Sequence, residues 1–525
     1  MISVHVASCQ CYSLLVDICW YEIDGVPIRI LNVVVGYHVL NPWQGNLSLV
    51  FVKNGIMTSK SEINLQNFYV YNSSFGQKEG EEEKKILFYY PPKTDFDTQM
   101  KNVGLSEAIV KFSDTFNPDQ LCEALHTQKT RQLYHQAEQG FWMVMTVNIP
   151  FVIKVKDGTE YLEYQSDDVQ DNVYLAVLQQ SYKMFRLFKG SFTAILSSSG
   201  ADVTQLKQKL DHFFSRYLLS LKLNHSDILD IFQGIQFLPL DKQTFLHVQC
   251  FVNLIEATFA QVKYTAFLYN DQLVWSGLEA EDMQVIYRYL VTSLLPAHLE
   301  TELQGGSMPR HPTSPFSSSH YGRFVTGPPN LQDSSGNIGK VPKVHINNGM
   351  TPELYHLVVY RALSATVCLF IEGSLHLNID LFKRLDIFLG PQLTSLVSEV
   401  AEQCSRQATT SCTNSVDPSP KFVYFNKLNL AQKSTVHLDN RRSGNVAVTP
   451  EVLRLLADIN ADKARMSTTG EIILKTMSDY WVVGKLSNLR EFYVVIHQKN
   501  ANLIEINDEV KRLSDSQLQS IFFHD

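Results

Sequence analysis

Apolar positions that alternate or recur at helical spacing divide the chain into stretches with a common order of predicted elements. The first stretch opens with two β-rich segments, NFYVYNSS from Asn67 and KKILFYYPP from Lys84. Residues 100–116 follow, with apolar side chains at the spacing of one helix face. FWMVMTVNIP then predicts a further strand, and residues 172–192 and 203–223 predict two closing helices.

The same order returns in the middle and at the end of the chain. KYTAFLYNDQLVWSGL predicts a hairpin with Asn270 and Asp271 in its turn. It is followed by a predicted helix at 281–295, strands at 323–326, 341–347 and 357–371, and helices at 379–389 and 392–404. The last stretch has strands KFVYFNKLN and STVHL, a helix at 450–459, the strand pair EIILKTMSDYWVVGKL and REFYVVIHQ, and a helix at 506–523. Three successive α+β units are therefore predicted.

Polar stretches rich in Gly, Ser, Pro and Asn mark the expected limits of these units. Residues 304–340 have little apolar content except around 321–325, which predicts a long loop that holds one short strand. QATTSCTNSVDPSP has almost no apolar residues and predicts a linker. The chain is thus divided into an extension of unknown role at 1–66, a first domain at 67–225, a second at 226–406, a linker at 407–420 and a third domain at 421–525.

The predicted helix at 100–116 has apolar side chains on two faces. At 100° per residue, the main stripe is centred near Leu105, and we expect it to pack on the sheet of its own domain. Val103 and Val110 fall together on the opposite side, with Ser106 beside them. This second strip is a candidate partner-facing surface, and the alternative is that two exposed valines are ordinary surface. The main stripe consists of Leu105, Ala108, Ile109, Phe112 and Phe116.

Composition and charge exclude several classes of protein. Hydrophobic residues make up 45% of the 525 positions and charged residues 19%, which is typical of folded globular chains. The 45 Lys and Arg against 53 Asp and Glu give a net charge of −8, so no basic excess is present to bind nucleic acid. Eight scattered Cys favour a reducing, cytoplasmic compartment over a disulfide framework. Neither a membrane span nor a signal peptide is expected.

A search for motifs that carry chemistry leads to the expectation of a protein that is not an enzyme. GNIGKV at 336–341 is too short for a phosphate-binding loop and is interpreted as a loop tip. Cys9 and Cys11 form a CxC pair without a second pair at zinc-site spacing. No nucleophile and base arrangement is recognisable around the candidate histidines, which are His135, His247, His311, His320 and His437. No catalytic, cofactor-binding or metal-binding residues, and no cofactor, are therefore assigned.

Several long strings are similar to one known family when taken together. They are YNSSFGQKEGEEEKKILFYYP, LHTQKTRQ followed by FWMVM, KYTAFLYNDQLVWSGLE, HYGRFVTGP, FNKLNLAQKSTVH, KTMSDYWVVGKLSN and QKNANLIEINDEVKRL. In this order, from about Asn67 to Asp525, the chain resembles the vacuolar fusion proteins of the Ccz family. The resemblance implies three successive longin-type domains, each an antiparallel sheet flanked by helices, in agreement with the three predicted α+β units. Residues 1–66 show no pattern of the family.

The resemblance also implies a function. Members of the Ccz family form a heterodimer with a Mon-family subunit, and the pair is a guanine-nucleotide exchange factor for the late-endosomal Rab GTPase. The first longin domains of both subunits displace the first switch of the GTPase and expel magnesium and GDP. A chain of this kind is expected in the cytoplasm, recruited peripherally to late-endosomal and lysosomal membranes in endosome maturation and autophagosome–lysosome fusion. Two alternatives stay open: a non-catalytic tethering or adaptor subunit, and a third accessory subunit in the complex.

Overall fold

A computed structural model describes most of the chain beyond residue 60. The described residues are 2–3, 14–23, 26–35, 52–53, 56–57, 60–116, 121–156, 159–200, 202–304, 322–331, 337–347, 352–411, 420–437, 446–463 and 469–518. They form two compact units, of which the smaller comprises Met1–Glu62 and Ile149–Ser166 and the larger comprises Ile63–Asn148 and Asp167–Asp525. Cys9, Cys11, His311 and His320 lie outside the described residues, so the interpretation of these side chains is not tested.

The described elements that lie wholly within the smaller unit are strands. Its elements are β1 (Ile2–Ser3), β2 (Leu14–Ile23), β3 (Val26–Val35), β4 (Val52–Lys53), β5 (Ile56–Met57), β11 (Phe151–Lys156) and β12 (Thr159–Tyr164). These strands pair as a β1–β2–β3 sheet and two hairpins, β4–β5 and β11–β12. Lys60 bridges to Val152, so the chain just before the first domain adds to the β11–β12 hairpin.

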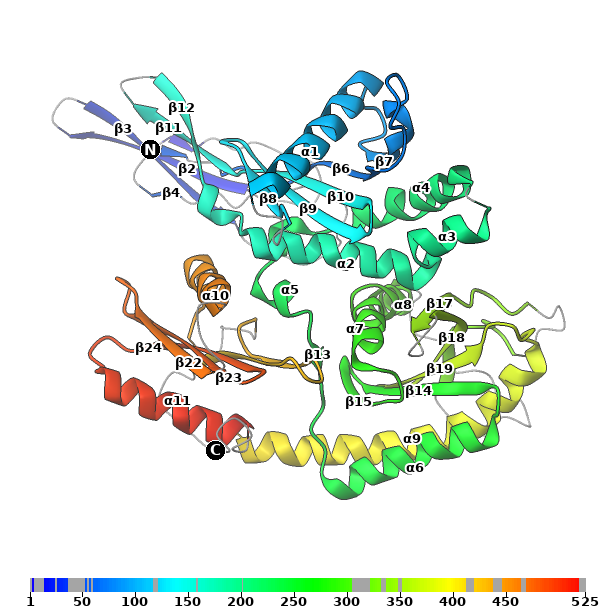
Figure 1. The fold of residues 1–525 in the computed structure, drawn as a ribbon. Coiled ribbons are helices and arrows are strands. Elements are labelled where there is room, and N and C mark those ends of the chain that lie inside the picture. The colour runs from blue at the N-terminus through cyan, green and yellow to red at the C-terminus, as the bar shows by residue number, and fades with distance from the viewer. Residues whose placement is uncertain are drawn as a thin grey trace. The chain divides into compact units, whose positions relative to one another are not determined.

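The first domain of the larger unit is a five-stranded antiparallel sheet with helices on both faces (Figure 1). Its strands are β6 (Leu65–Asn72), β7 (Ile86–Tyr90), β8 (Ala124–His126), β9 (Thr130–Glu138) and β10 (Phe141–Asn148), and its helices are α1 (Phe96–Phe116), α2 (Asp171–Lys189), α3 (Phe192–Ser198) and α4 (Val203–Ser220). Neighbouring residues of β6 point to opposite faces: Tyr69 lies in the cluster under α1, whereas the ring of Phe68 is 4.9 Å from that of Phe214 on α4. The strand order is β7-β6-β10-β9-β8.

The second domain repeats this architecture with one additional helix. Its strands are β14 (Val262–Tyr269), β15 (Gln272–Ser276), β16 (Gly322–Thr326), β17 (Lys343–Asn347), β18 (Pro352–Ala362) and β19 (Ala365–Glu372), and its helical segments are α6 (Lys242–Thr258), α7 (Ala280–Tyr289), the π-helical segment η4 (Leu290–Leu294), α8 (Leu295–Gln304) and α9 (Ile379–Ser411). The sheet order is β15-β14-β19-β18-β16, and β17 also pairs with β18. Helices α6 and α9 cover one face, and α7 with η4 covers the other.

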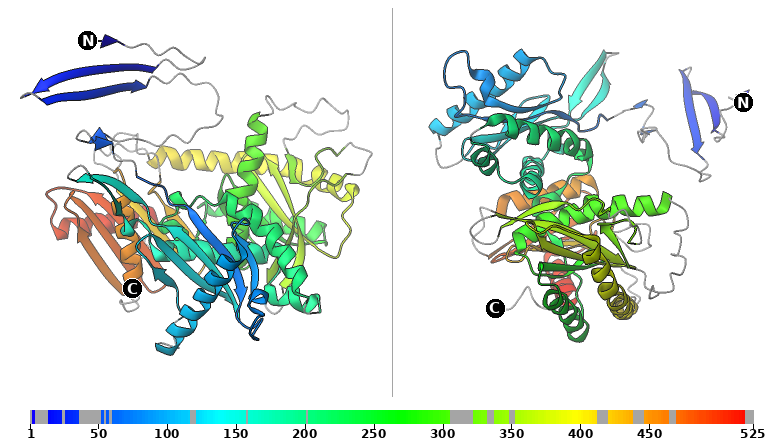
Figure 2. Two further views of the ribbon diagram at one scale, coloured as in Figure 1. Left: turned by 90° about the horizontal axis from the view of Figure 1, so that it is seen from above. Right: turned by 90° about the vertical axis from the view of Figure 1, so that its right-hand side faces the viewer.

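Helix α9 is continuous, although the sequence predicts two helices separated at Gly390 and Pro391 (Figure 2). The prediction of a break is wrong because the two halves share one buried apolar face. Leu389 and Leu393, on either side of the Gly-Pro pair, are both fully buried against the same core. Packing on the sheet therefore outweighs the missing N–H of Pro391. The helix extends to Ser411, so the first residues of the predicted linker are helical.

The third domain receives elements from the segment between the first two domains. Its sheet consists of β20 (Lys421–Asn426), β21 (Ala431–Ser434), β22 (Thr469–Lys475), β23 (Tyr480–Ser487) and β24 (Arg490–His497), with helices α10 (Pro450–Asp462) and α11 (Leu503–Leu518) on opposite faces. Strand β13 (Ile235–Gln236) pairs in parallel with β21, and α5 (Ile228–Phe232) packs beside α10. Residues 228–236, which the sequence assigns to the second domain, thus contribute to the sheet and core of the third.

One strand order unites the three domains. In the first and third sheets the strands of the domain, numbered along the chain, follow the order 2-1-5-4-3 from one edge to the other, with β13 as an extra edge strand in the third. The second sheet has the same order when β17, which pairs with β18 beside this path, is left out of the numbering. The first strand of each domain therefore lies beside the last, and a helix connects the second strand to the third. This repetition confirms the predicted fold class of three successive α+β domains with antiparallel sheets flanked by helices.

Candidate functional site

Helix α1 begins where the chain leaves the edge strand β7. The Asp95 carboxylate accepts a hydrogen bond from the backbone N–H of Thr98 at 2.8 Å, which satisfies one free donor of the first turn. This hydrogen bond lowers the pKa of Asp95 below its ordinary value. The helix then runs for 21 residues across one face of the first sheet.

The sheet face under α1 is built largely from tyrosines. Tyr69, Tyr71, Tyr89 and Tyr134 form this layer, and the rings of Tyr69 and Tyr89 are stacked with their centroids 5.2 Å apart. Burial raises the pKa of Tyr134 to about 12 and raises that of Tyr69 still further. These phenols therefore stay neutral, and the hydroxyl groups of Tyr69 and Tyr89 find hydrogen-bond partners on the helix.

The helix meets this layer with small and polar side chains. The Ser106 hydroxyl lies 2.6 Å from the Tyr69 hydroxyl, and Asn102 donates a hydrogen bond of 2.6 Å to the Tyr89 hydroxyl. Glu107 is buried between Lys85 and Lys111, each at 2.6 Å. Burial alone would raise the pKa of Glu107, but the two ammonium groups outweigh it and the pKa lies below its ordinary value.

The prediction that Val103, Ser106 and Val110 face a partner is wrong, because these side chains are the buried face of α1. Their exposed fractions are 2%, 0% and 9%. The helix has two apolar faces, as the sequence indicates. The strip of Val103 and Val110 packs on the sheet, however, and the stripe centred near Leu105 is exposed. The bulky tyrosines fill the space above the sheet, so the helix can approach closely only with short side chains.

The opposite face of α1 carries an exposed apolar strip, which we call the outer strip. It consists of Leu105, Ala108, Phe112 and Phe116, with Ile109 at its edge. Leu105 is 55% exposed, Phe112 is 66% exposed and Phe116 is 73% exposed. The rings of Phe112 and Phe116 contact each other edge to face at 4.8 Å. Three large exposed side chains on one helix face are typical of a surface that binds another protein.

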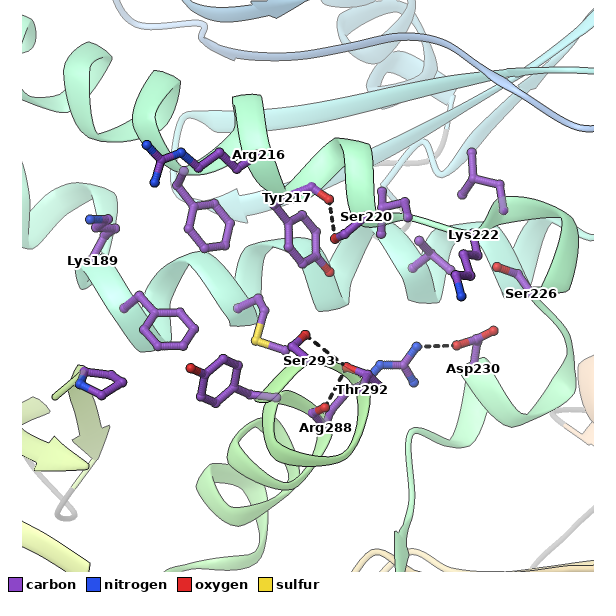
Figure 3. A pocket seen from close by; sticks show the side chains of 18 of the residues that line it. Lys189, Arg216, Tyr217, Ser220, Lys222, Ser226, Asp230, Arg288, Thr292 and Ser293 are labelled. Carbon is purple, nitrogen blue, oxygen red and sulfur yellow. Dashed lines mark hydrogen bonds and ion pairs between the residues drawn. The ribbon is translucent and has the colours of Figure 1, made fainter. Parts of the chain in front are cut away.

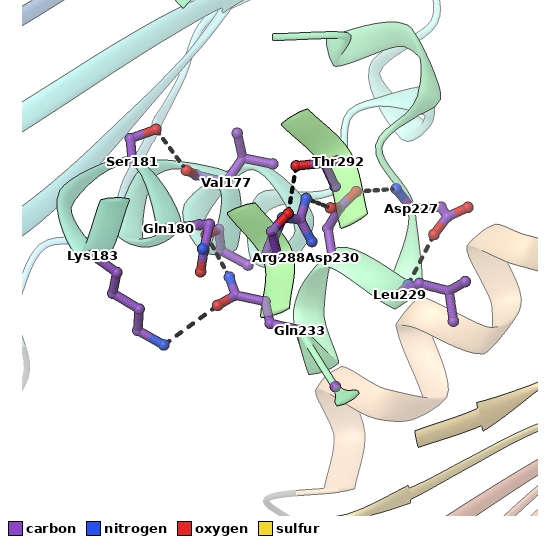
Figure 4. Close-up of polar contacts among 12 residues, drawn as sticks. Val177, Gln180, Ser181, Lys183, Asp227, Leu229, Asp230, Gln233, Arg288 and Thr292 are labelled. Atoms are coloured by element: carbon purple, nitrogen blue, oxygen red, sulfur yellow. Dashed lines mark hydrogen bonds and ion pairs between the residues drawn. The ribbon is translucent and has the colours of Figure 1, made fainter. Parts of the chain in front are cut away.

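A polar network joins the three domains at the middle of α2 (Figure 4). The buried Gln284 of α7 donates to Gln180 of α2 and to Gln233 at distances of 3.3 and 3.4 Å. Gln233 in turn donates to the carbonyl of Ala176 at 2.8 Å. Arg288 of α7 forms an ion pair of 2.5 Å with Asp230 of α5. These contacts fix the segment that leads from the first domain to the second.

A cavity opens beside this network (Figure 3). Its volume is about 950 Å³, and its walls come from α2, α4, the segment that follows α4, and the turn from α7 into η4. Because the lining is scattered from Val177 to Lys343, no local sequence pattern indicates it. Only the packing of the first and second domains brings these residues together.

The candidate histidines do not form a common site among the described residues. His247 contacts Glu399, and His437 contacts Asp227, each at 2.6 Å, so each histidine pairs with one carboxylate of a neighbouring segment. His135 packs near the ring of Tyr182, and burial lowers its pKa to about 4. In the described part of the chain, no three His, Cys, Asp or Glu side chains could together hold a metal ion.

Comparison with protein families assigns all three domains. The profile described as "First Longin domain of INTU, CCZ1 and HPS4" matches residues 65–190. Profiles for the second and third longin-like domains of Intu match residues 262–390 and 416–513. The fold therefore defines a tandem array of three longin-like domains.

Whole-chain relatives identify the family more closely. A vacuolar fusion protein CCZ1 homolog of Xenopus laevis is 50% identical over 464 residues, which cover 88% of this chain and 97% of the relative. The homolog of Nematostella vectensis is 50% identical over 467 residues, covering 89% and 99%. That of Dictyostelium discoideum is 29% identical over 469 residues, covering 88% and 98%. The chain belongs to the CCZ1 family of vacuolar fusion proteins and has a role in membrane trafficking.

Proposed function

We propose that the chain is one subunit of a heterodimeric guanine-nucleotide exchange factor for the late-endosomal Rab GTPase, with a Mon-family protein as its partner. Membership of the CCZ1 family and the three longin-like domains support this function. The observation that carries it is the outer strip of α1, because it gives the first domain an apolar surface for a protein partner.

Exchange of this kind requires binding and no covalent chemistry in the exchange factor. A surface that binds the nucleotide-free GTPase more tightly than the nucleotide-bound form lowers the affinity of the GTPase for GDP. In our proposal the first longin domain supplies part of such a surface. In our proposal the outer strip is covered by the Mon-family subunit, and the two first domains together contact the GTPase.

The experiment is release of a fluorescent GDP analogue from the late-endosomal Rab. It compares this chain alone, the Mon-family subunit alone, the pair, and buffer. We expect release above the spontaneous rate with the pair only. Equal release with this chain alone would contradict the requirement for a heterodimer. A pair that forms and binds the GTPase without accelerating release would favour the alternative, a tethering or adaptor subunit.

We further propose that the complex is recruited from the cytoplasm to late-endosomal and lysosomal membranes as a peripheral component. Among the described residues, no helix combines the length and the apolar character needed to cross a bilayer. Localisation of a fluorescent fusion protein, with and without the Mon-family subunit, tests this proposal. A signal that stays diffuse in cells with abundant late endosomes would contradict it.

A further inference from the structure

The cavity between the first two domains has a strongly biased charge. Five Lys and Arg side chains line it, and Asp230 is the single carboxylate among its lining residues. Asp230 is already paired with Arg288 at 2.5 Å. The whole chain has a net charge of −8, so a local excess of cations is not a general property of this surface. The cations raise the local concentration of anionic ligands.

Four of these cations have no partner within the described residues. Lys189, Arg216, Lys222 and Lys343 form neither an ion pair nor a side-chain hydrogen bond there. Figure 3 shows Lys189 and Arg216 toward one end of the cavity and Lys222 toward the other, near Asp230. Their donors are therefore available to an anionic group.

The inner wall of the cavity is apolar and aromatic. Phe213 and Tyr217 of α4 are stacked with ring centroids 5.3 Å apart. Phe188 of α2 meets Tyr289 of α7 edge to face at 4.8 Å, and Met184 also lines this wall. Apolar side chains below and cations at the rim suit a molecule that has both an anionic head and an apolar body.

The backbone around the cavity argues against an extended peptide as the ligand. Most of the lining belongs to α2, α4, α7 and η4, whose backbone groups bond within their own helices. A bound strand would find few backbone donors or acceptors, which are the main source of affinity when a peptide adds to a sheet. A volume of about 950 Å³ is of the size that holds a small molecule.

We propose that this cavity binds a phosphate-bearing amphiphile. The phosphate contacts the cations Lys189, Arg216, Lys222 and Lys343, and the apolar body lies on the aromatic wall. Because α2 and α4 belong to the first domain and α7 with η4 to the second, the ligand contacts both domains. Two sources supply ligands of this chemistry: membrane phospholipids, and soluble phosphorylated compounds with an apolar part.

Calorimetric titration of the full chain with dioctanoyl phosphatidic acid, below its micelle concentration, tests the proposal. Glycerol 3-phosphate lacks the apolar body, and dioctanoylglycerol lacks the phosphate. We expect saturable binding of dioctanoyl phosphatidic acid at one site and binding at least about tenfold weaker for each of the other two. Binding of dioctanoylglycerol with equal affinity would overturn the role of the cations.

Two variants locate the binding. Arg216→Glu with Lys222→Glu reverses two charges at the rim, and Ser293→Trp fills the cavity from an exposed position without changing the charge. Both should weaken binding at least about tenfold. The matched control, Lys207→Glu with Lys383→Glu, makes the same charge change at exposed positions outside the cavity and should bind normally. Equal loss in the control, or no loss in either cavity variant, would overturn the proposal.

Flotation with vesicles separates the two sources of the ligand. The vesicles contain dioleoyl phosphatidylcholine with or without dioleoyl phosphatidic acid. Flotation that depends on phosphatidic acid and is lost in both cavity variants supports a membrane lipid. Binding of the soluble lipid without flotation supports a soluble ligand in the same cavity. A cooperative unfolding transition shows that the wild-type protein is folded. If this folded protein binds neither the soluble lipid nor the vesicles that contain phosphatidic acid, the proposal is overturned.

Discussion

At the residue scale, the tyrosines of β6, β7 and β9 decide which face of α1 is buried. Their rings occupy most of the space between sheet and helix, and the hydroxyl groups of Tyr69 and Tyr89 require polar partners. Ser106 and Asn102 satisfy the hydroxyls of Tyr69 and Tyr89, and Gln132 donates a further hydrogen bond of 2.7 Å to Tyr69. A helix that packs here with leucines would leave the Tyr89 hydroxyl without its partner and the Tyr69 hydroxyl with Gln132 alone. A buried hydroxyl group left unpaired costs about 1–3 kcal/mol.

The two faces of α1 should respond in opposite ways to a carboxylate. Val103→Asp places an unpaired charge in a site that is 2% exposed, and we expect a loss of about 3 kcal/mol or more in the free energy of unfolding. Leu105→Asp changes a side chain that is 55% exposed and should cost less than about 1 kcal/mol. Urea unfolding of the full chain measures both. A larger loss for Leu105→Asp than for Val103→Asp would show that the faces are the reverse of those described.

Partner binding should depend on the outer strip. Phe112→Asp with Phe116→Asp would place two charges against an apolar partner surface, and capture by the Mon-family subunit should weaken by about 2 kcal/mol or more. The unfolding temperature of the free chain should hold, since these side chains are 66% and 73% exposed.

The control for the outer strip is a pair of equally exposed apolar residues elsewhere. Leu219→Asp with Ile387→Asp changes side chains that are 73% and 70% exposed on α4 and α9. This variant should bind the Mon-family subunit as the wild type does. If both double variants bind normally, the outer strip is not the interface.

His135 should make the first domain sensitive to acid. Burial, and secondarily the charge of Lys183, lowers the pKa of His135 from 6.5 to about 4. Between these values the unfolded chain binds a proton that the folded chain does not, so stability is complete above pH 6.5 and falls as the pH falls toward 4. The full loss is about 3 kcal/mol. Urea unfolding at several pH values between 4 and 6.5 measures this dependence. His135→Gln should reduce the slope of the free energy of unfolding against pH, and an unchanged slope would show that His135 is not its cause.

At the scale of elements, the segment after α4 is shared between domains. Asp227 accepts a backbone hydrogen bond from Leu229 at 2.8 Å and so begins α5. The αL conformation of Gln233, with φ of 49°, then ends the helix and turns the chain into β13. This short helix and strand complete a face and an edge of the third domain before the chain enters the second.

Phe232 should therefore stabilise the third domain although it precedes the second in sequence. Its ring is stacked on Phe425 at 4.9 Å and lies 5.7 Å from Tyr493. Phe232→Ala should cost about 3 kcal/mol and increase hydrogen exchange in β20 and α10. The neighbouring Ile231→Ala, at a half-buried position, should cost less. Faster exchange in the second domain alone would contradict this placement.

At the scale of the whole molecule, residues 1–59 should be dispensable for the larger unit. β6 begins at Leu65 and obtains its sheet partners from β7 and β10, both within the larger unit. Residues 60–61 are best retained, because Ser61 exchanges hydrogen bonds with Phe151 at 2.8 and 2.9 Å. Deletion of 1–59 should leave the main unfolding transition and capture by the Mon-family subunit unchanged. A lower transition temperature or insoluble expression would show that the extension contributes to a core.

The sequence by itself determined the elements and their repetition. Periodic apolar positions are local, so α1, α4 and α10 and the hairpin of β14 and β15 are found close to their predicted positions. The long strings shared with the Ccz family indicate membership without reference to the fold. The three α+β domains follow from local apolar periodicity, and the family follows from the shared strings, so both can be predicted from the sequence alone.

Only the tertiary structure decided which surfaces face inward and which segments share a domain. The burial of Val103 in place of Leu105 depends on the tyrosines of strands that α1 meets in space. The pairing of β13 with β21 joins residues about 200 positions apart, and the cavity is lined by residues from both sides of a domain boundary. A helical repeat of apolar positions indicates that two faces of a helix differ. The shape and polarity of the surface on which the helix packs determine which face is buried.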